Sequence, residues 1–367
     1  MNKTMIIIFL AAVLAAVTYV MVRIWNILPL GNIAKTVVVA FAVLLIVSMA
    51  LSIVVGMEKL PVSLAAVIYE ITTSWVMILL YLFMFFLLLD ILRLTHVIPA
   101  DLLNNSLKGT LLVTGVIFAI FLYGNIHYYH KYRTTISATT EKQLSKPYKV
   151  LMLSDLHIGY HNQRGTLAKW VDMLNTENAD LILLAGDVID ISPYPVNQQR
   201  MYEEFHRLNA PVYACLGNHE YISGVGEAKD FYRKAGIKLL VDTCVPLGDD
   251  LLIVGRNDRS NPNRKTIPQI LQGQDTSRYI FLLDHPPYNL EQTEQSGVDF
   301  QFSGHTHDGQ VFPINLITKA LYEKSYGSHQ RGKTQYYVSS GLGIWGGKFR
   351  IGTKSEYVVF ELSRKLM

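Results

Sequence analysis

The first third of the chain contains long apolar runs, and these constrain the fold more than any other feature. Four runs are long enough for a helix to cross a bilayer, which takes ~20 residues. They cover residues 5–22, 33–57, 62–89 and 111–129. Only ten of the 62 charged side chains of the chain lie in residues 1–129. The pattern predicts a helical transmembrane region over residues 1–130.

The first run has the length of a signal peptide, but no small-residue cleavage site follows it. Arg23, Ile24 and Trp25 are instead typical of a flank at the membrane interface. We find no paired charges within the runs, which argues against a transporter. Glu70 lies near one end of the third run, where we expect it to reach the headgroups; a functional carboxylate is the alternative. The region therefore predicts an integral membrane protein.

Four spans place both ends of the chain on the same side of the membrane. The loops and flanks of the opposite side hold Arg23, Lys35, Arg93 and Lys108. The segments on the side of the termini hold more positive charge: Lys3, Lys59, Lys131, Arg133, Lys142, Lys146 and Lys149. Because positive charge concentrates in cytoplasmic loops, the bias predicts a cytoplasmic C-terminal domain, and one extra crossing would reverse this orientation.

The rest of the chain has the pattern of a globular domain. A polar stretch at 131–146 predicts a linker, and residues 147–367 predict the domain. Apolar runs of strand length alternate there with helix-like stretches, which indicates an α/β fold whose strands are buried on both faces. The strand-like runs are "KVLMLSD", "DLILLAGD", "PVYACLGN", "RYIFLLDH" and "VDFQFSGH". The net charge of +4 comes without a long Lys/Arg block, so we expect no nucleic-acid binding.

Polar residues suited to metal chemistry stand where these runs end. Functional groups gather beyond the carboxyl ends of the strands in such sheets. Carboxylate, amide and imidazole ligands without a thiolate fit Mn²⁺, Fe²⁺, Co²⁺ or Zn²⁺. One tetrahedral site does not need so many ligands, whereas two ions ~3.5–4 Å apart that share a carboxylate would use them all. Such a pair activates a water for attack on phosphorus. The strand-end residues are Asp155, His157, Asp187, Asp190, Asn218, His219, Glu220, Asp284, His285, His305 and His307.

Five sequence blocks in this order and spacing resemble the calcineurin-like metallophosphoesterases over about residues 147–362. The blocks are Asp155-x-His157, Gly186-Asp187-x-x-Asp190, Gly217-Asn218-His219-Glu220, His285 and Gly304-His305-x-His307. The four spans and the "SSGLG" segment (339–343) resemble the membrane-anchored branch of that family. This branch comprises bacterial phosphoesterases of the YkuE type and transmembrane proteins with a metallophosphoesterase domain.

The resemblance implies a four-layer αββα sandwich with two mixed sheets. It also implies roles for the matched residues. Asp155, His157 and His307 would bind the first ion, and Asp187 would bridge the two ions. Asn218, His285 and His305 would bind the second ion. His219 would act on the phosphoryl group or the leaving oxygen, and Asp190 would orient His219.

These expectations combine into a membrane-anchored phosphohydrolase that uses two divalent ions and a hydroxide bridging them, in a bacterial cell membrane. Tethering favours a phospholipid or a lipid-linked phosphate as substrate. The motifs leave monoesterase and diesterase activity open. The alternative is a membrane sensor or scaffold in which the domain is an output or structural module. The apolar segment 311–322 is expected to pack in the core, and contact with the membrane surface is its alternative.

Overall fold

The computed structural model describes residues 3–365, which form two compact units. The first unit contains the described residues up to Asn125 together with Gly346–Lys348. The second unit contains Ile126–Trp345 and the described residues from Phe349 onward. Each unit is described on its own below.

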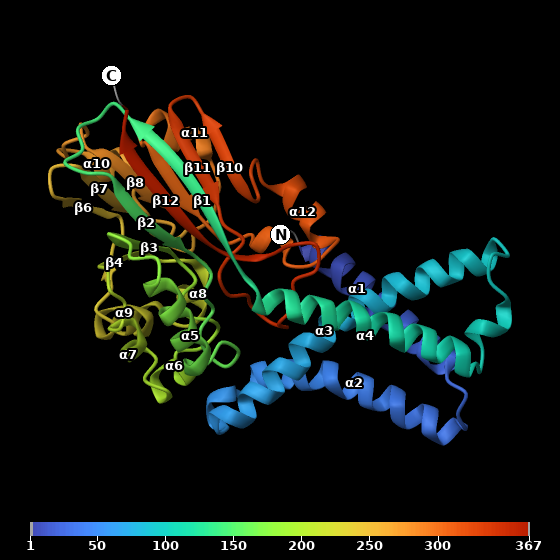
Figure 1. Cartoon of the computed structure of the whole chain (residues 1–367). Helices are drawn as coiled ribbons and strands as arrows, with labels where there is room; N and C mark the ends of the chain where they lie inside the picture. The colour runs from blue at the N-terminus through green and yellow to red at the C-terminus, as the bar shows by residue number, and fades with distance from the viewer. Residues whose placement is uncertain (1–2, 366–367) are drawn as a thin grey trace. The chain divides into compact units, whose positions relative to one another are not determined.

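The first unit is built from four long helices, each long and apolar enough to cross a membrane, so the described residues contain the four apolar helices that the sequence predicts. The third helix runs for 33 residues without a break, so its long apolar run forms a single candidate span. Figure 1 shows these four helices, labelled α1 to α4. The elements are α1 (Lys3–Ile27), α2 (Asn32–Val55), η1 (Met57–Lys59), α3 (Val62–Leu94), η2 (Ala100–Leu103) and α4 (Leu107–Tyr129).

Two charged residues at the edges of the apolar runs pair with each other. Arg23, on α1, forms an ion pair with Asp90, on α3, which also accepts a hydrogen bond from Tyr19. Both charges lie just outside the runs read from the sequence but inside the helices. The two residues are 67 positions apart in the sequence, so no local pattern predicts this ion pair. Glu70 pairs with Lys348 of the same unit at 3.1 Å.

The second unit contains two six-stranded sheets (Figure 1). The strand order is β1-β12-β2-β3-β4-β5 in the first sheet and β10-β11-β9-β8-β7-β6 in the second. Both sheets are mixed: β12 is antiparallel to β2, and β7 is antiparallel to β6, while β2, β3 and β4 are parallel. The strands of the first sheet are β1 (Lys131–Thr140), β2 (Tyr148–Leu153), β3 (Leu181–Ala185), β4 (Val212–Cys215), β5 (Lys238–Leu239) and β12 (Ser355–Arg364). Those of the second are β6 (Thr243–Leu247), β7 (Leu251–Gly255), β8 (Tyr279–Leu283), β9 (Phe300–Ser303), β10 (Gly327–Arg331) and β11 (Thr334–Val338).

Alternating side chains of the central strands enter two different cores. Val150 and Met152 of β2 pack between the two sheets, whereas Leu151 and Leu153 pack against the helices on the outer face of the first sheet. A strand covered on both faces needs apolar residues at every position, which explains the continuous apolar runs. A third core packs α10 (Ile267–Leu271) onto the second sheet. The predicted αββα sandwich is confirmed. The remaining helices of this unit are α5 (Arg164–Asn175), α6 (Tyr194–Gln198), α7 (Tyr202–Phe205), α8 (Asn218–Ile222), α9 (Val225–Lys234), α11 (Leu290–Gln295), η3 (His307–Gly309) and α12 (Ile314–Leu321).

The structure differs from the sequence reading at the stretch predicted as a linker, 131–146. Its first ten residues form β1, which pairs with β12 along its whole length. Every second residue of β1, from Tyr132 to Thr140, is at least partly buried, and the residues between are mostly exposed. Three of those five inward positions are Tyr or Thr, so the alternation of a half-buried strand is weak in the sequence.

Helix α12 contradicts the expectation that segment 311–322 packs in the core. Leu316, Ile317 and Leu321 are exposed, at 53%, 56% and 70% of their surface. The polar Asn315 is the buried member of this helix. The apolar composition suggested a core segment because the sequence does not reveal which side of a short helix faces the protein.

Candidate metal centre

The predicted site residues come from the loops that follow five strands of the two sheets. Strand β2 leads to Asp155 and His157, β3 leads to Asp187 and Asp190, and β4 leads to Asn218 and His219 at the start of α8. In the second sheet, β8 leads to His285, and β9 leads to His305 and His307. The second sheet therefore completes a site that the first sheet begins.

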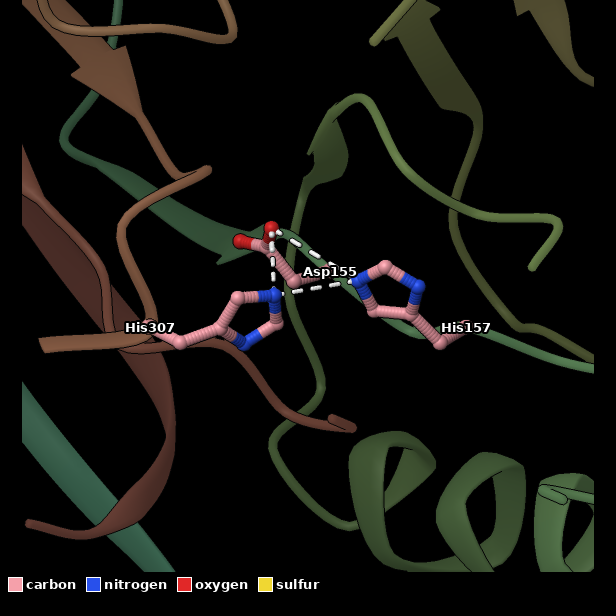
Figure 2. Close-up of side chains that lie close together, drawn as sticks. All are labelled: Asp155, His157 and His307. Carbon is pink, nitrogen blue, oxygen red and sulfur yellow. Dashed lines mark hydrogen bonds and ion pairs between the residues drawn. The ribbon is translucent and has the colours of Figure 1, made fainter. Parts of the chain in front are cut away.

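Asp155, His157 and His307 form a buried group whose polar atoms converge (Figure 2). His307 Nε2 lies 3.4 Å from Asp155 Oδ1 and 3.1 Å from His157 Nε2. Burial, together with the nearby His157 ring, lowers the pKa of His307 well below its ordinary value. A neutral imidazole is the form that binds metal, so the group fits one divalent cation.

Asp187 belongs to two further groups, one with His157 and His219 and one with His285 and His305. Its Oδ2 lies 3.9 Å from His157 Nε2 and 3.0 Å from His285 Nε2. Burial alone would raise the pKa of Asp187, but the imidazoles of His285, His219 and His157 together outweigh burial and hold that pKa well below its ordinary value. The carboxylate is therefore ionised and lies between two sets of histidines.

Protein oxygens contact the Nδ1 atoms of His285 and His305 and so orient both rings. The carbonyl of Ala185 lies 2.6 Å from His285 Nδ1, so Nε2 of that ring faces Asp187. Asn218 Oδ1 lies 2.8 Å from His305 Nδ1, which places the predicted amide ligand beside this group. The Nε2 atom of His285 is buried, and apart from its 3.0 Å approach to Asp187 Oδ2 it has no hydrogen-bond partner among the described residues. A carboxylate, an amide oxygen and imidazoles with unused nitrogens fit a second divalent cation.

Asp190 contacts two histidines through one oxygen. Its Oδ1 lies 3.2 Å from His157 Nδ1 and 3.3 Å from His219 Nδ1. Burial lowers the pKa of His219, but Asp190 and the charge of Asp187 outweigh burial and raise it to about 9. The His219 side chain is 12% exposed, whereas that of His157 is fully buried. His219 is thus a positively charged group on the open side of the site.

The backbone is in the left-handed region at five of the seven proposed metal ligands. These are Asp155, His157, Asp187, His305 and His307, with φ between 45° and 74°. Such a conformation costs about 1–3 kcal/mol at each residue and persists only where the surroundings enforce it. Strain of this kind concentrates at functional sites, and here it turns side chains from several loops toward common points.

Two glycines allow the loops to approach each other closely. A Cβ atom at Gly217 would lie 2.2 Å from Asp187 Oδ1, and one at Gly304 would lie 2.2 Å from Asp155 Oδ2. These distances are far shorter than any van der Waals contact, so a side chain at either position would displace a proposed ligand.

Two supporting residues were given no role in the sequence analysis. Glu220 is fully buried, and its carboxylate accepts hydrogen bonds from the backbone N–H groups of Asp187, Val188, Ile189 and Gly217. It also accepts one from the Tyr232 hydroxyl. Glu220 therefore fixes the loop that carries Asp187. The sequence signals for Glu220 were its position after a strand-like run and its place in the third sequence block.

Arg350 is the second missed residue, and it is fully buried. Its guanidinium donates to the carbonyls of His307, Ser340 and Gly343 and to the Ser355 hydroxyl. The contacts tie the turn that carries His307 to the loop after β11. No sequence motif around Arg350 predicts this role.

Comparisons with known proteins match this part of the chain. The family model for calcineurin-like phosphoesterases matches residues 148–309. An uncharacterized metallophosphoesterase of Campylobacter jejuni is 33% identical over 259 residues, which are 68% of this chain and 69% of that protein. The uncharacterized metallophosphoesterase YkuE of Bacillus subtilis is 29% identical over 71% of this chain and 96% of its own length. A transmembrane protein with metallophosphoesterase domain from Danio rerio is 27% identical, over 57% of this chain and 51% of that protein.

Proposed function

Because the chain belongs to the calcineurin-like metallophosphoesterase family, we propose that it is a membrane-anchored hydrolase that holds two divalent cations and cleaves phosphoester bonds. Mn²⁺, Fe²⁺, Zn²⁺ and Co²⁺ all suit its donor atoms. The first cation would be held by Asp155, His157 and His307 and the second by Asn218, His285 and His305, with Asp187 between them.

The observation that carries this proposal is the position of Asp187. A structural metal site needs one closed set of ligands, whereas this carboxylate is shared by groups on both of its sides. A shared carboxylate is the arrangement of two-metal sites that act on phosphate esters. When bound, the two cations would polarise the phosphoryl oxygens and activate a water.

The protein groups around the centre have separate tasks in this reaction. His219, charged and partly exposed, would stabilise the developing negative charge on the phosphoryl group and give its proton to the leaving oxygen. Asp190 would hold His219 for that step. Asp190 also contacts His157, so it would fix the position of His219 relative to a ligand of the first cation.

The membrane anchor supports a substrate that itself resides in the bilayer. Four candidate spans in the same chain hold the catalytic domain at the membrane, which raises its effective concentration toward lipid substrates. The proposed substrates are therefore phospholipids and lipid-linked phosphates.

Metal analysis combined with a panel of phosphoesters tests the proposal. The purified full-length protein is expected to bind two divalent ions per chain and to lose hydrolysis on chelation. Mn²⁺ or Zn²⁺ should restore the activity. The panel contains a nitrophenyl monoester, a nitrophenyl diester and a phospholipid. His307→Ala should lose metal and activity, whereas the matched control His206→Ala, at an exposed histidine, should keep both.

A protein that binds two ions yet hydrolyses no member of the panel would contradict the enzymatic assignment. That result would favour a scaffold or sensor in which the same site is structural. Turnover that survives complete removal of metal would contradict the role of the cations.

A further inference from the structure

Helix α12 presents its apolar side chains outward and buries the polar Asn315. Ile314, Leu316, Ile317 and Leu321 are exposed, and so is Phe312 just before the helix. Asn315 is buried, and its backbone lies against Gly309 of η3. Other helices of the same unit are oriented in the usual way: the buried side chains of α5 include Leu167, Trp170 and Leu174. A contiguous apolar surface of this kind marks a site of contact.

The same helix is connected at both ends to the metal centre. Its N-terminal side packs on η3, the turn that carries His307. The residue after its C-terminus, Tyr322, lies with its ring centroid 6.2 Å from that of His305. The Tyr322 hydroxyl accepts a hydrogen bond from Tyr288, at 2.9 Å. Whatever covers the exposed face of α12 therefore lies beside the open edge of the site.

Chain connectivity favours the bilayer as the occupant of this face. The last candidate span ends at Tyr129 and β1 begins at Lys131, so a single residue separates membrane helix from catalytic sheet. A connection that short keeps part of the domain within a few residues' reach of the membrane surface, at ~3.3–3.6 Å per residue. The exposed Lys319 of α12 suits the headgroup level, where a long basic side chain contacts anionic lipid.

We propose that α12 is an interfacial helix that inserts Leu316, Ile317 and Leu321 into the acyl boundary of the bilayer and so seats the metal centre at the headgroups. An amphipathic helix of this type buries its apolar face ~5–10 Å into the interface. Part of this inference, the delivery of a lipid phosphoester to the metals, rests on the proposed function. The docking itself does not, and it is tested separately.

Fluorescence quenching on the full-length protein in nanodiscs of phosphatidylethanolamine and phosphatidylglycerol tests the docking. A fluorophore is attached at Ile317→Cys, with Leu316→Cys as a second probe, in a Cys244→Ser background. Cys215 is buried and is left unchanged. The matched control is Gln274→Cys, an exposed position before β8 and thus at the end of that strand opposite His285.

The α12 probes should be quenched by nitroxide-labelled lipid and protected from aqueous iodide, whereas the control should show the reverse. Iodide quenching of the α12 probes equal to that of the control would overturn the proposal. Protection from both quenchers would overturn it as well, because the face would then be covered by protein, either the chain's own helices or a second copy.

A second measurement concerns the substrate. The double variant Ile317→Glu/Leu321→Glu should lower the rate on a phospholipid relative to the rate on nitrophenyl phosphate by about a hundredfold, since each of the two lost apolar insertions is worth roughly tenfold. An unchanged ratio would contradict delivery through α12. If neither substrate is hydrolysed by the unmodified protein, the proposed function fails, while the quenching result still decides the docking.

Discussion

Replacing Glu220 by glutamine tests whether the loop of Asp187 is held by a buried carboxylate. All five groups that contact the Glu220 side chain are donors: four backbone N–H groups and the Tyr232 hydroxyl. Burial and the charge of Asp187 raise the pKa of Glu220, yet donors on every side require an acceptor without a proton. Glutamine keeps the shape of the side chain and replaces one acceptor oxygen with an NH₂ donor.

The magnitude follows from how the donors divide between the two oxygens. Asp187 N–H and Gly217 N–H donate to Oε2, and Val188 N–H and Ile189 N–H donate to Oε1. Either orientation of the amide therefore sets its NH₂ against two buried N–H groups. Each buried donor without a partner costs ~1–3 kcal/mol, so Glu220→Gln should lower the free energy of unfolding by about 2–6 kcal/mol.

Thermal unfolding of the detergent-solubilised protein measures this loss. For a domain of this size, 1 kcal/mol corresponds to ~2–4 °C in Tm, so a loss near the middle of the range lowers Tm by roughly 8–16 °C. The control Glu227→Gln, in the exposed first turn of α9, should cost less than ~1 kcal/mol. A Glu220→Gln protein that melts within about 2 °C of this control would refute the reasoning.

Three further outcomes are expected. Asp187→Asn should reduce bound metal at both positions and abolish hydrolysis; two retained ions with near-normal turnover would rule out a bridging role. His219→Ala should keep its metal while kcat falls by ~10²–10⁴-fold on an alkyl phosphoester, and by less on a nitrophenyl ester whose leaving oxygen needs no proton. Metal loss in His219→Ala, measured by elemental analysis, would make His219 a ligand instead. A phosphatase reporter that is active only outside the cytoplasm, fused after residue 367, should be inactive because the charge bias predicts a cytoplasmic C-terminus. An active fusion would contradict that orientation.

The sequence predicted those parts of the structure that are encoded by a short run of neighbouring residues. A strand buried on both faces is a continuous apolar run, and a ligand at the end of such a run is a polar residue after it. The runs of β2, β3 and β8 and the residues Asp155 and His285 are therefore visible in the sequence. The apolar spans are visible for the same reason, since composition over ~20 residues is enough to identify them.

The features that the sequence did not predict depend on partners far along the chain. Strand β1 has few strongly apolar inward positions, and it is ordered by pairing with β12. The ion pair between Arg23 and Asp90 joins two helices. Glu220 was recognised as a strand-end residue, but its role as an acceptor depends on backbone N–H groups of the loop that carries Asp187. In each case the energy comes from tertiary contacts rather than from local propensity.

The place of β12 between β1 and β2 bears on how the protein is made. Lys131 pairs with Ser355, so β1 leaves the ribosome 224 residues before its partner does. At ~5–20 residues per second, a nascent β1 waits on the order of 10–45 s beside the membrane. During that interval one edge of β2 is also open, because the same partner covers it. A message that terminates before codon 355 would thus yield an anchored chain whose first sheet cannot close, and such open edges are the surfaces that chaperones and proteases recognise.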